Sequence, residues 1–462
     1  MTGPFRPRPD HLPIAAVALV FAAPAVGDRP IPGGGGDLQV VHVVCVAAIA
    51  VTGLWVLAGR LPVSFRLCGR VALGRPEIRP PLWFGAGLVA AAAASTSTAA
   101  DQVRGLKVTA TYAAGWLVLL SVLLVATSPG KLRTLVGAAV VGSLAVTLPI
   151  LSQAERLKPV YGGAVVRNRA QSIFADPNQF GCYAALIVLL AVGWFLAAPQ
   201  RWERVLAVAG GSGAVAALVL SLSRGAWLGT AAGLVTAAVL HPAVRRALVA
   251  AVAVSATLLA AGLLVSLTAP AEVRGGPAAG LVEVVVDRIA VIDDRAANPH
   301  DVRPITWREA VRQFREHPVL GNGPGSFSRL SAQSPSIIQF APRLHAHNAL
   351  LQLGAETGVV GLAAGLGFAG SCGLAALVTA RRLRRTLDAE ATVADAGAGD
   401  AGRTLGLVAG AAGALVALSV HLMVDYPIRN PVLMIAAWSV AGLLLATGSA
   451  IRAPADAALV RA

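Results

Sequence analysis

Apolar stretches of roughly 18 to 25 residues recur along the chain, without the alternation of apolar and polar positions that is typical of strands. A helix of about 20 apolar residues crosses the ~30 Å hydrocarbon core of a bilayer. The pattern therefore predicts an all-α protein, a polytopic transmembrane helical bundle of about twelve helices. The expected spans are 11–27, 38–59, 81–100, 107–128, 132–152, 178–198, 204–222, 225–241, 246–269, 347–379, 404–425 and 431–451.

The spacing of these spans predicts three parts. An N-terminal transmembrane bundle of about nine helices occupies 1–269, and a long loop comes next at 270–346. The remaining transmembrane helices lie in 347–462. The long loop is the part with room for a small subdomain outside the bilayer.

The long loop contains a helical pattern of its own. Apolar residues at i, i+3, i+4 and i+7 mark an amphipathic helix that lies on the membrane surface or caps a cavity. The helix is expected to end at His317–Pro318, because the glycines and proline of 321–327 require turns. The residues of the apolar pattern are Trp307, Ala310, Val311 and Phe314.

The distribution of basic residues predicts the orientation. The chain is 56% hydrophobic and 13% charged, with a formal net charge of +15. With the N-terminus in the cytoplasm, twenty Lys and Arg residues fall on the inner side and nine in the short outer loops. Both termini are therefore expected in the cytoplasm. Because the basic residues lie in short clusters between spans, no nucleic-acid surface is predicted.

The cysteines indicate no metal or disulfide chemistry. Cys45, Cys182 and Cys372 fall in apolar spans and Cys68 in a basic loop. They form no CxxC pair and no Cys/His cluster at metal-ligand spacing. The sequence therefore predicts neither a disulfide framework nor a metal site.

Four polar groupings fall at the outer end of this topology. They are 167–180, 223–225, 345–348 and 425–431. Polar groups at membrane depth are costly to bury and usually mark function, and helix ends at one face can line one cavity. We therefore expect a single site built from all four groupings.

Three arginines at this face each allow two interpretations. Arg224 lies between two spans with almost no loop, so its guanidinium either reaches the outer headgroups or faces a cavity that holds an anion. Arg167 and Arg169 are either solvated surface residues or members of the same anion site. A planar guanidinium binds phosphate oxygens in pairs, which favours phosphate as the anion.

A polar stripe begins at His347. Asn348, Gln352 and Glu356 come next at four-residue spacing, on one face of an otherwise apolar helix. His347 is either a base that removes a proton from a hydroxyl or a residue that caps a helix end. His345 is a second candidate for the same role.

Other polar residues favour structural interpretations. The run Asp176-Pro177-Asn178 indicates a turn and an N-cap for the sixth span, although Asn178 also suits a sugar hydroxyl. Asp425 and Arg429 flank a Tyr-Pro turn and are expected to pair with each other.

Glycines four or three residues apart favour close packing of one helix. Small residues at this spacing allow a neighbouring helix to approach closely. The residues are Gly354, Gly358, Gly361 and Gly365.

Four segments of the chain together resemble the O-antigen ligase and polymerase superfamily of bacterial membrane glycan enzymes. They occur in the family's order, and the last two are the most specific. The segments are FADPNQFGCY (174–183), SRGAWLG (223–229), WREAVRQFREHPVLGNGPGSF (307–327) and HAHNALLQLGAETGVVGL (345–362).

The resemblance implies a bundle of the C-type glycosyltransferase kind. Such an enzyme transfers a glycan from a polyprenyl-diphosphate carrier to an acceptor hydroxyl of a glycan, lipid or protein, among membrane lipids at the outer face of the cytoplasmic membrane. No metal, nucleotide or other cofactor is implied. Arg224 and Arg169 would hold the diphosphate, and His347 would be the base. The further substrate-binding residues expected are Arg167, Asn178, His345, Asn348, Glu356 and Asp425.

A transporter or flippase of an anionic or lipid-linked substrate is the alternative. Many spans and a basic cavity suit such a protein. A transporter, however, shows two related halves and ionisable residues near mid-membrane. Here the halves look unalike and the candidate residues lie at the outer helix ends, which favours the enzyme.

Overall fold

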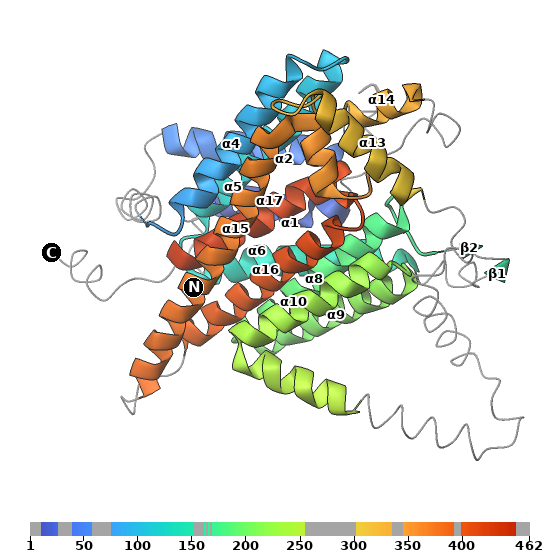
Figure 1. Cartoon of the computed structure of the whole chain (residues 1–462). Coiled ribbons are helices and arrows are strands. Elements are labelled where there is room, and N and C mark those ends of the chain that lie inside the picture. The colour runs from blue at the N-terminus through green and yellow to red at the C-terminus, as the bar shows by residue number, and fades with distance from the viewer. Residues whose placement is uncertain are drawn as a thin grey trace, which may run out of the picture.

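The computed structural model describes most of the predicted helices. These form a helical bundle, accompanied by one two-residue antiparallel pair, β1 (Tyr161–Gly162) and β2 (Val165–Val166) (Figure 1). The predicted all-α membrane bundle is thereby confirmed. Arg167 and much of the predicted long loop lie outside the described residues. The described residues are 11–25, 39–57, 75–150, 161–162, 165–166, 169–254, 302–334, 345–391 and 399–449.

Eight helices of the described part are long and apolar enough to cross a membrane. The protein is therefore a multi-pass membrane protein. The total of twelve stays a prediction, because parts of the chain lie outside the described residues. The eight helices are α2 (Val40–Leu57), α5 (Gln102–Val125), α6 (Pro129–Thr147), α8 (Pro177–Ala197), α9 (Arg201–Leu220), α15 (Ala349–Ala391), α16 (Asp400–Leu422) and α17 (Pro431–Ser449).

Shorter or less apolar elements complete the bundle. Most begin or end within a few residues of a predicted span. A further helical stretch occupies 242–254, where the ninth span was expected to begin. The shorter elements are α1 (His11–Ala22), η1 (Ala23–Ala25), α4 (Arg79–Thr96), α10 (Arg224–Leu240), α13 (Arg303–Glu316), α14 (Phe327–Gln333) and η5 (Pro427–Arg429).

α16 packs closely between α8 and α10. A Cβ atom on Gly410 of α16 would lie 2.8 Å from the Cα of Gly193 in α8, and one on Gly233 of α10 would lie 2.6 Å from the carbonyl oxygen of Gly413. Glycines at these positions let the backbones approach to a distance that any side chain would prevent. This packing fixes the ends of α8, α10 and α16 relative to one another.

α15 is broken at Gly358, which has φ +62° and ψ −164°. A Cβ on Gly365 would lie 2.7 Å from the Leu353 side chain, and one on Gly361 would strike Thr357, so these glycines face α15 itself. The prediction that this spacing serves a neighbouring helix is wrong at both positions. The break redirects the chain, and the glycines accommodate the bend.

α13 and α14 lie at one end of the bundle (Figure 1, yellow). The predicted amphipathic helix is confirmed as α13, with His317 as its C-cap. Its buried residues are, however, mostly polar, whereas Trp307 and Val311 are exposed to 38% and 37%. The apolar pattern therefore predicted the helix but not the face by which it packs.

Candidate active site

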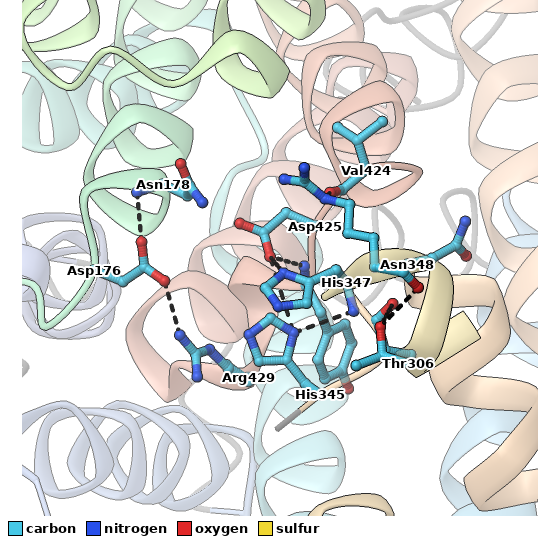
Figure 2. Close-up of polar contacts among 12 residues, drawn as sticks. Asp176, Asn178, Thr306, His345, His347, Asn348, Val424, Asp425 and Arg429 are labelled. Atoms are coloured by element: carbon cyan, nitrogen blue, oxygen red, sulfur yellow. Dashed lines mark hydrogen bonds and ion pairs between the residues drawn. The ribbon is translucent and has the colours of Figure 1, made fainter. Parts of the chain in front are cut away.

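The start of α15 meets the end of α16 at a histidine–carboxylate pair. The Nδ1 atom of His347 lies 3.0 Å from an oxygen of Asp425 (Figure 2). Asp425 is buried, whereas the side chain of His347 is 20% exposed. The pair therefore joins a shielded carboxylate to an imidazole that remains accessible.

The short segment before α15 holds His347 in an uncommon backbone conformation. Its φ is +50°, in the left-handed region that non-glycine residues rarely adopt. Asn348 fixes the first turn of α15, because its side-chain oxygen accepts from the N–H groups of Leu350 and Leu351, at 2.9 and 3.1 Å. Its amide nitrogen donates to the carbonyl of Met423 (2.9 Å). Asn348 thereby caps α15 and ties it to the end of α16.

His345 packs against His347, with ring centroids 3.9 Å apart. Its Nδ1 accepts the backbone N–H of His347 (3.2 Å). Burial is the main cause that lowers the pKa of His345 to about 3, and the neighbouring His347 and Arg429 act in the same direction. His345 is therefore neutral at neutral pH and carries its proton on Nε2.

Asp425 stays ionised. Burial alone would raise the pKa of its carboxyl, but the hydrogen bond from His347 and the electrostatic attraction of the nearby imidazoles outweigh that effect and hold the pKa well below its usual range. The N–H of Tyr426 also donates to this carboxylate (2.8 Å). Because a carboxylate only accepts, Nδ1 of His347 carries the proton of this hydrogen bond. In the neutral imidazole, the lone pair is then on Nε2.

A second cluster lies where α8 and α10 begin. Arg169 donates from Nε to the carbonyl of Ser221 (2.8 Å) and from Nη2 to Oδ1 of Asn178 (2.6 Å). Ser223 caps α10 by accepting the N–H of Ala226, and the half-buried Arg224 is the first residue of α10. The structure thus brings the first and second predicted groupings together.

Arg429 pairs with Asp176 and not with Asp425. Its Nη2 atom lies 2.9 Å from the Asp176 carboxylate (Figure 2). The predicted Asp425–Arg429 pair is therefore wrong, because the η5 turn points the two side chains to different partners. The predicted role of Asp176 as an N-cap is confirmed, since it caps α8 by accepting the N–H of Asn178 (2.7 Å).

Two residues of the site were missed in the sequence. Arg303, the first residue of α13, donates from Nε to the carbonyl of Val424 (3.0 Å), beside Asp425. His421 is buried in the last turn of α16, next to Gly225. The apolar pattern of α13 could have placed Arg303 at the start of this helix. The neighbouring sequence, however, contains no signal that α13 contacts the end of α16.

The other predicted site residues divide by their distance from His347. Asn348 and His345 lie beside His347. Glu356 is buried further along α15 and contacts other protein groups, among them Gln352. Arg167 lies outside the described residues.

His345, His347 and Asp425 also have the composition of a metal site. Their candidate ligand atoms lie within 4.8 Å of one another. Both Nδ1 atoms, however, already take part in hydrogen bonds, one with Asp425 and one with the His347 backbone. A metal ion bound at these Nδ1 atoms would have to displace both hydrogen bonds.

An apolar cavity of about 500 Å³ adjoins this cluster. Near the cluster it is lined by Ala349, Leu350, Tyr426 and Ile428. Elsewhere its lining includes residues from the opposite end of the bundle, such as Leu240 and Leu377. The cavity therefore runs from the polar cluster alongside α10, α15 and α16.

The protein is thus a multi-pass membrane protein with a polar site at one end of its helical bundle. The site contains a His–Asp pair and nearby arginines, and it adjoins an apolar cavity. Residues 209–366 match the family model described as O-antigen ligase. The match covers three of the four segments that carried the predicted resemblance, and it confirms that resemblance to the O-antigen ligase superfamily. No curated protein matches the chain.

Proposed function

We propose that this protein is a membrane glycosyltransferase of the ligase or polymerase type. It transfers a glycan from a polyprenyl-diphosphate carrier to an acceptor hydroxyl. The observation that carries the proposal is the His347–Asp425 pair, in which Nδ1 faces the carboxylate and Nε2 has no hydrogen-bond partner among the described residues. An apolar cavity lined by Ala349 and Tyr426 adjoins this pair. The O-antigen ligase match at 209–366 supports the same reaction class.

His347 acts as the general base. Its Nε2 accepts the proton of the acceptor hydroxyl while that oxygen attacks the anomeric carbon of the donor sugar. The bond between that carbon and the diphosphate oxygen breaks, and the electron pair leaves with the diphosphate. Asp425 stabilises the imidazolium that forms, as a buried carboxylate behind an imidazole does in other enzymes.

The arginines hold the leaving group. Negative charge builds up on the departing diphosphate, and guanidinium groups fixed in advance stabilise such charge. Arg169 is held by Ser221 and Asn178, and Arg303 is held by the Val424 carbonyl, so both are pre-oriented. Together with Arg224, they supply positive charge from α10, from α13 and from the segment before α8.

Asn178 and Asn348 have supporting roles in this proposal. Asn178 orients Arg169, and Asn348 fixes the start of α15. Arg167 is proposed to extend the anion site.

The apolar cavity accepts the polyprenyl chain. An isoprenoid tail needs a long apolar surface that begins at the diphosphate site, and the cavity begins at Ala349 and Tyr426 beside His347. A protein that handled a water-soluble donor would not need such a surface.

We place the site at the outer face of the cytoplasmic membrane, with both termini in the cytoplasm. Four arginines, residues 381, 382, 384 and 385, lie at the end of α15 far from His347. Basic clusters mark the cytoplasmic end of membrane helices. The opposite end, with the His–Asp pair, then lies outside.

A cell experiment separates this function from a flippase. Cells lacking the gene are complemented with the wild-type protein or with His347→Ala, and lipid-linked glycan is measured on each leaflet. The proposal predicts that His347→Ala reaches the membrane, accumulates precursor on the outer leaflet and forms no polymer. Precursor trapped on the inner leaflet would instead favour a flippase.

A further inference from the structure

His347 keeps an uncommon backbone conformation that must be stabilised by its surroundings. A non-glycine residue at positive φ is strained, and it persists only where several neighbouring contacts fix the backbone. One such contact comes from α15, where the side-chain oxygen of Gln352 accepts the N–H of Ala346 (2.8 Å). Gln352 therefore holds the backbone just before His347.

Gln352 is itself held by Glu356. Its amide nitrogen donates to a carboxylate oxygen of Glu356 (2.7 Å), one helical turn further on. Both side chains are buried, at 4% exposure. The amide orientation is unambiguous, because the Ala346 N–H requires an acceptor and the carboxylate requires a donor.

Glu356 joins this chain of contacts to the turn-rich segment 321–327. The N–H of Phe327 donates to the same carboxylate oxygen (3.3 Å). The backbone carbonyl of Glu356 accepts the N–H of Gly323 (2.9 Å) and the hydroxyl of Ser95 in α4 (2.6 Å). Glu356 thus lies where α4, α15 and the glycine-rich turn meet, next to the break at Gly358.

Thr306 of α13 completes the hold on the loop. Its hydroxyl lies 3.4 Å from the Ala346 carbonyl. The backbone of Ala346 is therefore contacted on its N–H by Gln352 and on its C=O by Thr306. Displacement of the Gln352 side chain would free the N–H side.

We propose that Gln352 and Glu356 are positioning residues that hold the His347 imidazole against Asp425. This inference rests on the proposed function, in which His347 is the base. Neither side chain touches substrate in it. They act through the backbone of Ala346 and His347, and through Glu356 they connect that backbone to the 321–327 segment.

The chain offers a matched control on α13. Gln313 donates to Glu309 (2.8 Å) with the same four-residue spacing and is likewise buried. It makes no hydrogen bond to 345–348 among the described residues. Gln313→Glu therefore introduces the same carboxylate pair at a similar depth, without touching the His347 loop.

The experiment uses the full-length protein in proteoliposomes, with turnover measured against donor and acceptor concentration. Gln352→Glu places two carboxyl groups in contact, and their repulsion displaces the side chain that holds the Ala346 N–H. It is expected to lower kcat by about 100-fold with the donor KM nearly unchanged, because a small misplacement of a catalytic group has effects of that size. Gln313→Glu is expected to stay within about threefold of wild type. The double variant Gln352→Glu/Glu356→Gln restores the donor–acceptor pattern and should recover at least about tenfold of the loss.

A readout that does not depend on glycan transfer separates the positioning role of Gln352 and Glu356 from the proposed transfer function. Labelling of His347 by diethylpyrocarbonate, followed by mass spectrometry, reports whether the imidazole has left Asp425. Faster labelling in Gln352→Glu but not in Gln313→Glu supports positioning, even if wild type transfers no glycan and the proposed function fails. Equal losses of kcat and of thermal stability in both single variants, with unchanged labelling, would overturn the inference.

Discussion

The imidazole of His347 lies 3.0 Å from the carboxylate of Asp425, although 78 positions separate them in the sequence. The contact exists because the beginning of α15 and the end of α16 meet at the same end of the bundle. It orients the imidazole ring so that Nδ1 faces the carboxylate and Nε2 faces away from it. The proposed chemistry depends on that order.

Asp425→Asn should nearly abolish glycan transfer. The amide can donate to Nδ1, which moves the proton to Nε2 and removes the lone pair of the base, so the rate should fall by roughly two to four orders of magnitude. Turnover in proteoliposomes measures the effect. Asp400→Asn, at the exposed start of α16, should keep the wild-type rate; an Asp425→Asn rate within about threefold of wild type would contradict the assigned tautomer.

Gly358→Ala should destabilise the protein, because its φ is +62° and a Cβ would collide with the Val319 carbonyl. The conformational cost alone is about 1–3 kcal/mol. Gly370 lies on the same helix with nothing within 4 Å of its Cβ position. Gly370→Ala should therefore stabilise by about 0.5–1 kcal/mol. Thermal unfolding in detergent checks both, and equal effects would refute the break as a fixed feature.

Acid should destabilise the fold through His345. Its pKa is about 3 when folded and 6.5 in the reference state, so below pH 6.5 the unfolded chain binds a proton that the folded protein does not. The contribution of His345 to the free energy of unfolding is therefore fully present above pH 6.5 and is lost as the pH falls. The loss amounts to about 2 kcal/mol between about pH 7.5 and 5.

Unfolding temperatures measured at both pH values check this dependence. His345→Gln should weaken it, whereas His317→Gln, at an exposed position, should not. The same pH dependence in all three proteins would show that His345 is not responsible. Asp425 is ionised over this whole range and adds no slope.

Chelators should leave transfer unchanged, whereas excess Zn²⁺ should inhibit it. The proposed base needs no metal, but His345, His347 and Asp425 can gather around one if their hydrogen bonds are displaced. The transfer rate with EDTA and with micromolar Zn²⁺ checks this. A loss of activity in EDTA that Zn²⁺ restores would assign these residues to a resident metal.

The sequence predicted the helices well, because an apolar stretch of about 20 residues satisfies its backbone hydrogen bonds in a bilayer by forming a helix. Asp176 as an N-cap and the helix after residue 302 were also predictable from local rules of capping and periodicity. The stripe from Asn348 to Glu356 was correctly placed on one helix face, as the Gln352–Glu356 hydrogen bond shows. These features depend on neighbours within a few residues.

Partners distant in sequence were not predictable in the same way. Asp425 and Arg429 are four residues apart and were expected to pair, but each found a partner in another part of the chain. Arg303 reaches the end of α16 only because α13 folds over that end of the bundle. The break at Gly358 likewise needs the 318–323 segment, whose Pro318 carbonyl accepts the N–H of Val359 (2.8 Å).

The proposed transfer reaction is tested most directly with purified protein in proteoliposomes. A polyprenyl-diphosphate-linked glycan and a hydroxyl acceptor are supplied, and both the new glycosidic bond and the released polyprenyl diphosphate are measured. We expect equal amounts of the two products with wild type and with the control His317→Gln, and neither product with His347→Gln. Transfer by His347→Gln at the wild-type rate, or movement of the lipid-linked glycan across the bilayer without bond formation, would contradict the proposed role of His347.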